Sequence, residues 1–254
     1  MPTYCFWTRG TLLSKWPGEL QIDLLSCQFS KGTKEYEFVV YTLIDARDDI
    51  EAKENGLEKC IEATNFLGFL LNQDISLNYR ERNIRRKNGG QKTSIGLTLT
   101  ILSNEELPAD KLSIIRQVQD SLKTLRPKDV VIITRAVNWF IGAKRDKVAL
   151  ADKYISFWIA LEVLVQGVGN NVHPKIKKRL FKLYPSANLI TMGKTIGRLY
   201  SLRKEIVHYG KKQPRGISDR TRDIENICED LVRDDLGLEF LAKSKHIFFS
   251  EVKE

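Results

Sequence analysis

The stretch LYSLRKEIVHYG, residues 199–210, decides how the second half of this chain is interpreted. Its apolar residues continue a helical spacing that starts upstream, which predicts one helix over residues 191–209 that ends at Gly210. Arg203 and His208 lie in the last two turns of that helix. On a straight helix they are about 140° apart, so they share a site only if the helix loosens near Gly210 or if two subunits meet there.

The sequence on both sides of this stretch is helical in period from residue 129 onward. Residues Asp146–Gly167 are apolar almost all round, so we expect them to form the central, most buried helix. Further helices are predicted over Asp129–Ala143, over His173–Leu183 with Pro174 in its first turn, and over Ser218–Phe240. The acidic residues of the last helix, Glu225, Glu229 and Asp230, are expected on its exposed side.

The first half is of mixed class. Residues Glu35–Ile44 are β-branched and aromatic and predict a strand, followed by a helix over Asp48–Leu71 that Asp45 or Asp48 can cap. Alternating residues at Ile75–Tyr79 and Ile95–Ile101 predict two strands of a hairpin, and a helix is expected from Pro108 to Leu125. We therefore predict an α+β domain over residues 1–125, an all-α helical bundle over residues 126–240 and a C-terminal tail over residues 241–254.

The positive charge of the chain is concentrated in one segment. Residues 1–125 hold 16 Lys and Arg against 17 Asp and Glu, whereas residues 173–222, here called the basic block, hold 14 against 2. Such a block favours RNA or another polyanion as partner, and a solvated face that only aids solubility is the alternative. The candidate RNA-binding residues are Lys175, Lys177, Lys178, Arg179, Lys182, Arg198, Lys211 and Lys212, of which the first five are expected to point outward.

A second group of cations lies at the predicted hairpin tip, residues 80–92. It contains Arg80, Arg82, Arg85, Arg86, Lys87 and Lys92, with Glu81 as the one acidic residue. The tip fits a nucleic-acid contact and a mobile surface loop equally well.

Several other classes of protein are disfavoured. Gly193-Lys194-Thr195 resembles the end of a phosphate-binding loop, but Asn188 stands where the motif needs glycine and the flanks are helical. The four cysteines form no close pair, so no zinc site is predicted and no cofactor or metal is expected. No apolar run is long enough to span a membrane, and the first residues do not resemble a secretion signal, so we expect a cytoplasmic protein without a membrane partner.

The helical half resembles the HEPN domain family, and the sequence LYSLRKEIVHYG resembles the ApeA-like branch of that family. Arg203, four intervening residues and His208 match the Arg-x(4–6)-His signature of that family. Residues Ala136–Phe140 resemble its first helix, and Tyr154–Leu164 (YISFWIALEVL) resembles its second. The resemblance covers residues 129–240, the whole helical half.

The resemblance implies a bundle of four to five helices that forms a homodimer, binds RNA and in many members cleaves it without a metal. Arg203 and His208 would be the catalytic pair, with Glu162, Lys204 and Tyr209 as supporting residues. Glu162 can orient Arg203 or pair with another nearby cation. The implied products carry 2′,3′-cyclic phosphate ends.

One residue departs from the family pattern. The position after the arginine is usually Asn or Asp in active members, and here it is Lys204. Lysine at this position favours an alternative, in which the helices form a non-catalytic dimeric interaction or nucleotide-binding module.

Overall fold

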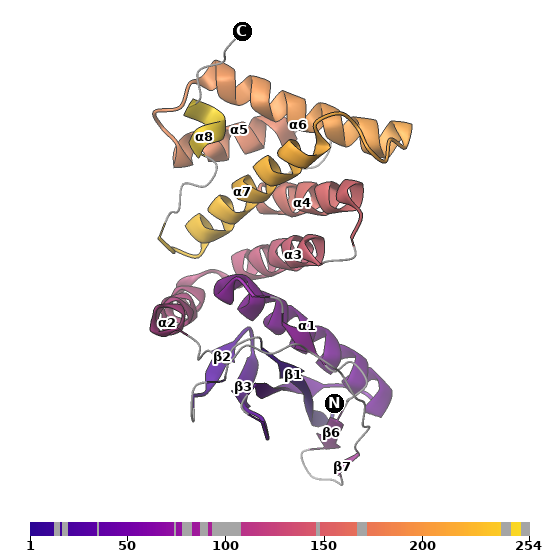
Figure 1. The fold of residues 1–254 in the computed structure, drawn as a ribbon. Helices are drawn as coiled ribbons and strands as arrows, with labels where there is room; N and C mark the ends of the chain where they lie inside the picture. Colours follow the sequence, from indigo (N-terminus) through magenta and orange to yellow (C-terminus); the bar gives the residue numbers. More distant parts are fainter. Residues whose placement is uncertain are drawn as a thin grey trace. The chain divides into compact units, whose positions relative to one another are not determined.

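The computed structural model describes residues 1–12, 16, 20–34, 36–73, 75–77, 83–86, 91–92, 108–145, 148–166, 172–239 and 245–249. The chain divides into two compact units, Met1–Asp120 and Ser121–Glu254 (Figure 1). This division falls five residues before the expected domain boundary, near the end of the last helix before that boundary. As expected, an α+β part precedes a helical part.

The N-terminal unit is built on an antiparallel sheet with strand order β2-β3-β4-β1-β6-β7, and β5 also pairs with β1. Strand β4 confirms the expected strand at Glu35–Ile44, whereas β1, β2 and β3 were not predicted, although Tyr4, Phe6 and Thr8 alternate as a strand requires. The expected strand at Ile95–Ile101 lies outside the described residues. The expectation that residues 80–92 form the tip of a hairpin was wrong in their described part, because residues 83–86 and 91–92 are the paired strands β6 and β7. The strands are β1 (Thr3–Thr11), β2 (Ile22–Leu24), β3 (Cys27–Lys31), β4 (Glu37–Asp45), β5 (Ser76–Leu77), β6 (Asn83–Arg86) and β7 (Gln91–Lys92).

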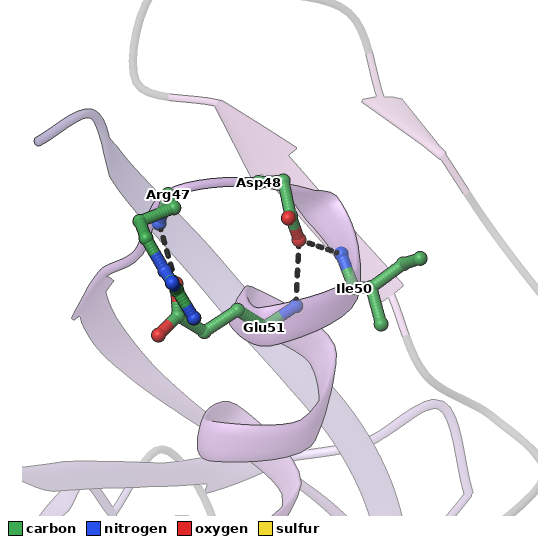
Figure 2. A network of polar contacts seen from close by, with 4 residues as sticks. All are labelled: Arg47, Asp48, Ile50 and Glu51. Carbon is green, nitrogen blue, oxygen red and sulfur yellow. Dashed lines mark hydrogen bonds and ion pairs between the residues drawn. The ribbon is translucent and has the colours of Figure 1, made fainter.

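Helix α1 (Asp49–Leu71) begins at a side-chain cap. The Asp48 carboxylate accepts hydrogen bonds from the backbone N–H groups of Ile50 and Glu51, each at 2.9 Å (Figure 2). Glu51 in turn accepts hydrogen bonds from the backbone and the guanidinium of Arg47. Asp48 is therefore the cap, and Asp45 instead accepts a hydrogen bond from the Thr3 hydroxyl. A cap of this type stabilises a helix by about 1 kcal/mol.

Helix α1 packs across one face of the sheet, against β1, β4, β6 and β3. It approaches the sheet closely at Gly56, where an added Cβ atom would overlap Cγ of Phe6. Phe6 is fully buried beneath the helix. Glycine at position 56 therefore lets the helix lie directly on the ring. Helix α2 (Ala109–Thr124) follows, and the Gln119 amide donates to the backbone oxygen of Asp23 in β2.

The C-terminal unit is helical throughout its described part. Helix α4 is central, because it packs against α3, α6 and α7 and its residues Tyr154, Phe157 and Trp158 are buried. This agrees with the prediction that residues Asp146–Gly167 contain the central helix of the bundle. The helices are α3 (Pro127–Lys144), α4 (Leu150–Leu164), α5 (Val172–Leu183), α6 (Leu189–Tyr209), α7 (Ile217–Asp235) and α8 (Lys245–Phe249).

One expectation for helix α7 was wrong. Asp230 does not lie on the exposed side of α7, because its carboxylate is buried and accepts a hydrogen bond from the Tyr184 hydroxyl at 2.8 Å. Glu225 and Glu229 on the same helix are half-buried. The predicted tail contains helix α8, whose Phe248 is buried against the Tyr184 ring, with the ring centroids 5.5 Å apart. In the part of the chain that the structure describes, no helix has the length and apolar content to cross a membrane.

Candidate functional site

Helix α6 carries Arg203 and His208 and is regular from end to end. The Asn188 side chain caps its start by accepting from the N–H groups of Ile190 and Thr191, and Gly210 ends it in the left-handed conformation at φ 62°. Gly193-Lys194-Thr195 lies inside this helix, which excludes a phosphate-binding loop there. Because the helix continues to Tyr209, it does not loosen before Gly210. Arg203 and His208 of one chain therefore lie about 140° apart around the axis and do not converge.

Arg203 is held on the side of α6 that faces α4. Its guanidinium Nη2 lies 3.9 Å from Oε1 of Glu162, and the two side chains are 27% and 23% exposed. The Trp158 indole donates a hydrogen bond to the same glutamate oxygen at 2.7 Å. At 3.9 Å the pair attracts through charge but makes no hydrogen bond. The guanidinium consequently keeps N–H groups that can donate to an anion.

The aromatic residues of α4 fix the position of α6 beneath this ion pair. The Tyr154 hydroxyl donates to the backbone oxygen of Leu199 at 2.5 Å. The rings of Trp158 and Tyr200 pack with their centroids 5.9 Å apart. Burial raises the pKa of Tyr154, so its hydroxyl stays protonated and remains a donor. Sequence reasoning missed the Tyr154 bond because its partner is 45 residues away.

His208 lies in the last turn of α6 and is exposed. Its neighbours Val207 and Tyr209 are 49% and 65% exposed. Lys204 precedes His208 by one turn and is exposed, so the two residues lie on the same side of the helix. The structure thus brings His208 together with Lys204, and Arg203 together with Glu162.

The cations of the basic block lie on α5, on α6 and in the loop that follows α6, and α5 runs beside the start of α6, where Lys177 lies near Gly193. Lys175, Lys178, Lys182, Arg198, Lys211 and Lys212 are exposed, and Lys177 is half-buried. Two of the exposed cations have protein partners, since the Lys175 ammonium donates to the backbone oxygen of Gln166 and the Lys211 ammonium lies 3.1 Å from the Glu205 carboxylate.

Arg179 was expected to point outward with its neighbours, and this was wrong. Its Nη2 atom donates a hydrogen bond to Asp235 at 2.6 Å and lies 3.7 Å from Asp234. The side chain therefore links α5 to the end of α7. The sequence of α5 cannot show this, because the carboxylates that bind Arg179 are more than 50 residues away.

Arg198 lines an open cavity of about 460 Å³ between α6, the start of α7 and α8. Its wall carries charges of both signs, namely the cations Arg198 and Arg220 and the anions Asp219 and Asp223. Because these charges balance, the cavity is less suited to a polyanion than the exposed lysines of α5. The remaining lining residues are Thr195, Leu199, Gly216 and Ile247.

The described residues contain no group of three or more His, Cys, Asp or Glu side chains placed to hold a metal ion. All four cysteines are free thiols, and Cys27, Cys60 and Cys228 are buried. Comparisons of the chain with protein-family models, with curated proteins and with solved structures gave no match.

Proposed function

We propose that the protein is an RNA-binding member of the HEPN family whose helical unit cleaves RNA slowly and without a metal ion. The observation that carries the proposal is the end of α6. There, an arginine held by a glutamate, an exposed histidine and a set of exposed lysines occupy consecutive turns. The N-terminal α+β unit would act as a sensor or as a guide for the substrate.

Side chains of these types are sufficient for the reaction. The 2′-hydroxyl of a ribose attacks the adjacent phosphorus, a base accepts its proton, and the 5′-oxygen of the next nucleotide leaves with a proton from an acid. A histidine can act as that base or acid near neutral pH. The Arg203 guanidinium would stabilise the negative charge that develops on the phosphate oxygens. The products are a 2′,3′-cyclic phosphate and a free 5′-hydroxyl.

The site requires two chains in this proposal. Since the two residues of one α6 helix point in directions about 140° apart, Arg203 of one subunit would act with His208 of another. A two-fold dimer is the commonest arrangement that provides such a composite site. Val207 and Tyr209, exposed beside His208, would contribute apolar surface to the contact.

Lys204 supports a second candidate function. A flexible ammonium next to Arg203 attracts phosphate but fixes no geometry, which favours a dimeric module that binds RNA or a nucleotide without cleaving it. Incubating the purified full-length protein with total RNA in EDTA separates the candidates. Fragments with cyclic phosphate ends support the nuclease, and intact RNA in a retained complex supports the binding module.

A further inference from the structure

The sheet of the N-terminal unit has two unlike faces. Helix α1 packs across one of them (Figure 1). Residues on the opposite face alternate with the buried ones along each strand. We define this open face by Trp7, Arg9, Tyr41, Leu43 and Arg85.

Two aromatic residues lie at the centre of the open face. Trp7 of β1 and Tyr41 of β4 are direct partners in the antiparallel register. Side chains in such a pair start about 5 Å apart and lie side by side on the sheet surface. Both are half-buried, so solvent reaches part of each side chain. Leu43, the next residue of β4 on this face, is 62% exposed.

Arginines border the aromatic pair. Arg9 follows Trp7 on the same face of β1, and Arg85 of β6 is opposite Cys5, which precedes Trp7 on that face. Both arginines are exposed. A guanidinium can bind phosphate oxygens and can stack on a base.

The carboxylates of this face lie on its edge strand β2 and at the ends of β4, where the charge of Asp23 acts on Tyr41 and that of Glu37 acts on Arg9. Asp23 on strand β2 accepts from the Gln28 amide at 2.8 Å, and Asp45 at the end of β4 accepts from the Thr3 hydroxyl at 2.7 Å. Glu37, at the other end of β4, accepts from the Thr33 hydroxyl at 2.6 Å. The centre of the face therefore combines aromatic rings with cations.

We infer that the open face binds single-stranded RNA, with bases stacked on Trp7 and Tyr41 and phosphates held by Arg9 and Arg85. Every base has a flat π-surface, so this mode tolerates many sequences. It excludes duplex RNA, whose bases are stacked on one another and are not free to splay onto a sheet. The inference rests on the proposed function for its ligand, but it concerns a surface in the other unit and needs no cleavage.

The test uses the full-length protein and a fluorescent twelve-nucleotide oligouridine at low salt. Replacing both rings by leucine, Trp7→Leu with Tyr41→Leu, keeps apolar volume and removes stacking, and we expect affinity to fall by roughly tenfold or more. Trp7→Phe with Tyr41→Phe should retain most of the affinity. Ile50→Ala, at a position of α1 that is 70% exposed and lies away from the open face, is the control and should bind as the wild type does.

Tryptophan fluorescence gives a readout that a purely structural role of the pair would not move. A stacked base quenches an indole, so oligouridine should quench the wild type, and Trp7→Phe should remove that quenching while the other three tryptophans remain. This comparison holds even if the leucine variant fails to fold. Quenching that is equal in wild type and Trp7→Phe overturns the inference.

Charge reversal on α5 distinguishes this inference from the proposed function. If Lys178→Glu with Lys182→Glu weakens overall binding but leaves the quenching of Trp7, the open face is an independent site. If the wild type binds RNA and the leucine variant binds it with the same affinity, the open-face site is refuted and the α6 proposal stands. Equal affinity for a duplex of the same length also refutes the open-face site.

Discussion

The Arg179 guanidinium lies 2.6 Å from the Asp235 carboxylate and joins helix α5 to the end of helix α7. The side chains are 29% and 22% exposed, so the pair is only partly screened by solvent. Arg179→Met should lower the free energy of unfolding by about 1–3 kcal/mol, whereas Lys178→Met should change it little. Urea unfolding followed by circular dichroism measures both, and equal effects would show that the link is unimportant.

The same pair makes stability depend on pH. Burial raises the pKa of Asp235, and the Arg179 guanidinium opposes that rise without cancelling it. The folded state therefore holds this proton more tightly than the unfolded state does. The contribution of Asp235 is complete below the ordinary aspartate pKa of about 4 and is lost as pH rises through the folded pKa. Without the cation the pKa rises further, so Arg179→Met should be more destabilising at pH 7 than at pH 4. The opposite order would contradict this assignment.

RNA affinity should depend on the exposed lysines of α5 rather than on Arg179. Lys178→Glu with Lys182→Glu should weaken binding to many sequences about equally, because phosphate contacts carry no sequence information. Each lost phosphate contact should also reduce the slope of log K against log salt by about 0.7. Lys59→Glu with Arg116→Glu makes the same charge change at exposed positions of the N-terminal unit and is the control. If both variants lose the same amount of RNA affinity, the loss depends on the net charge of the protein and not on the position of the basic block.

Cleavage should depend on Arg203 and His208 and should be limited by Lys204. Arg203→Ala and His208→Ala are expected to abolish the release of 2′,3′-cyclic phosphate ends in EDTA while the protein stays folded. A misplacement of about 1 Å can cost on the order of a hundredfold in rate, so Lys204→Asn should accelerate cleavage by up to that factor. If the wild type and Lys204→Asn both leave RNA intact at high protein concentration, the nuclease proposal fails.

Mixing two inactive variants tests whether the site is shared between subunits. In a random mixture of Arg203→Ala and His208→Ala chains, about half of the dimers are mixed, and each has one of two composite sites intact. About a quarter of the wild-type rate should return after the chains exchange, and light scattering on the full chain should give twice its mass. A site contained within one chain would give no recovery.

Glu162 can be tested without disturbing Trp158. Glu162→Gln keeps an oxygen that accepts from the indole and removes the charge that attracts Arg203. We expect slower cleavage with little change in unfolding free energy, because such a partly exposed ion pair contributes no more than about 1 kcal/mol. Glu162→Leu also removes the acceptor of the indole N–H and should lower stability more. Unchanged cleavage in Glu162→Gln would mean that Glu162 does not position Arg203.

The features that sequence predicts well in this protein are those decided by neighbouring residues. Asp48 caps α1 and Gly210 ends α6 because the groups that they satisfy lie within a few residues. The central position of α4 follows from its apolar surface. Strand β1 was missed although Tyr4 and Phe6 alternate with less buried residues, because its aromatic partners on β4 are far away in sequence.

The side-chain partners of the helical unit required the structure. Asp230 looks like a solvent-exposed residue on α7 until Tyr184, 46 residues earlier, is placed beside it. Arg179 looks like one of several equivalent cations until Asp235 is placed opposite. For Arg203 the sequence left two possibilities for Glu162, and the 3.9 Å contact selects the one in which they pair. The direction of each α6 side chain, by contrast, follows from helix geometry alone.

The contact between Gly56 and Phe6 constrains how this chain can change over evolution. A side chain at position 56 would overlap the ring at position 6, so neither residue can be replaced independently by a larger one. A lineage that acquires alanine at 56 must first acquire a smaller residue at 6, and a reversion at 6 is then blocked. Positions 6 and 56 should therefore covary among descendants of this sequence. A larger residue at position 56 of the helix should occur together with a smaller one at position 6 of the strand.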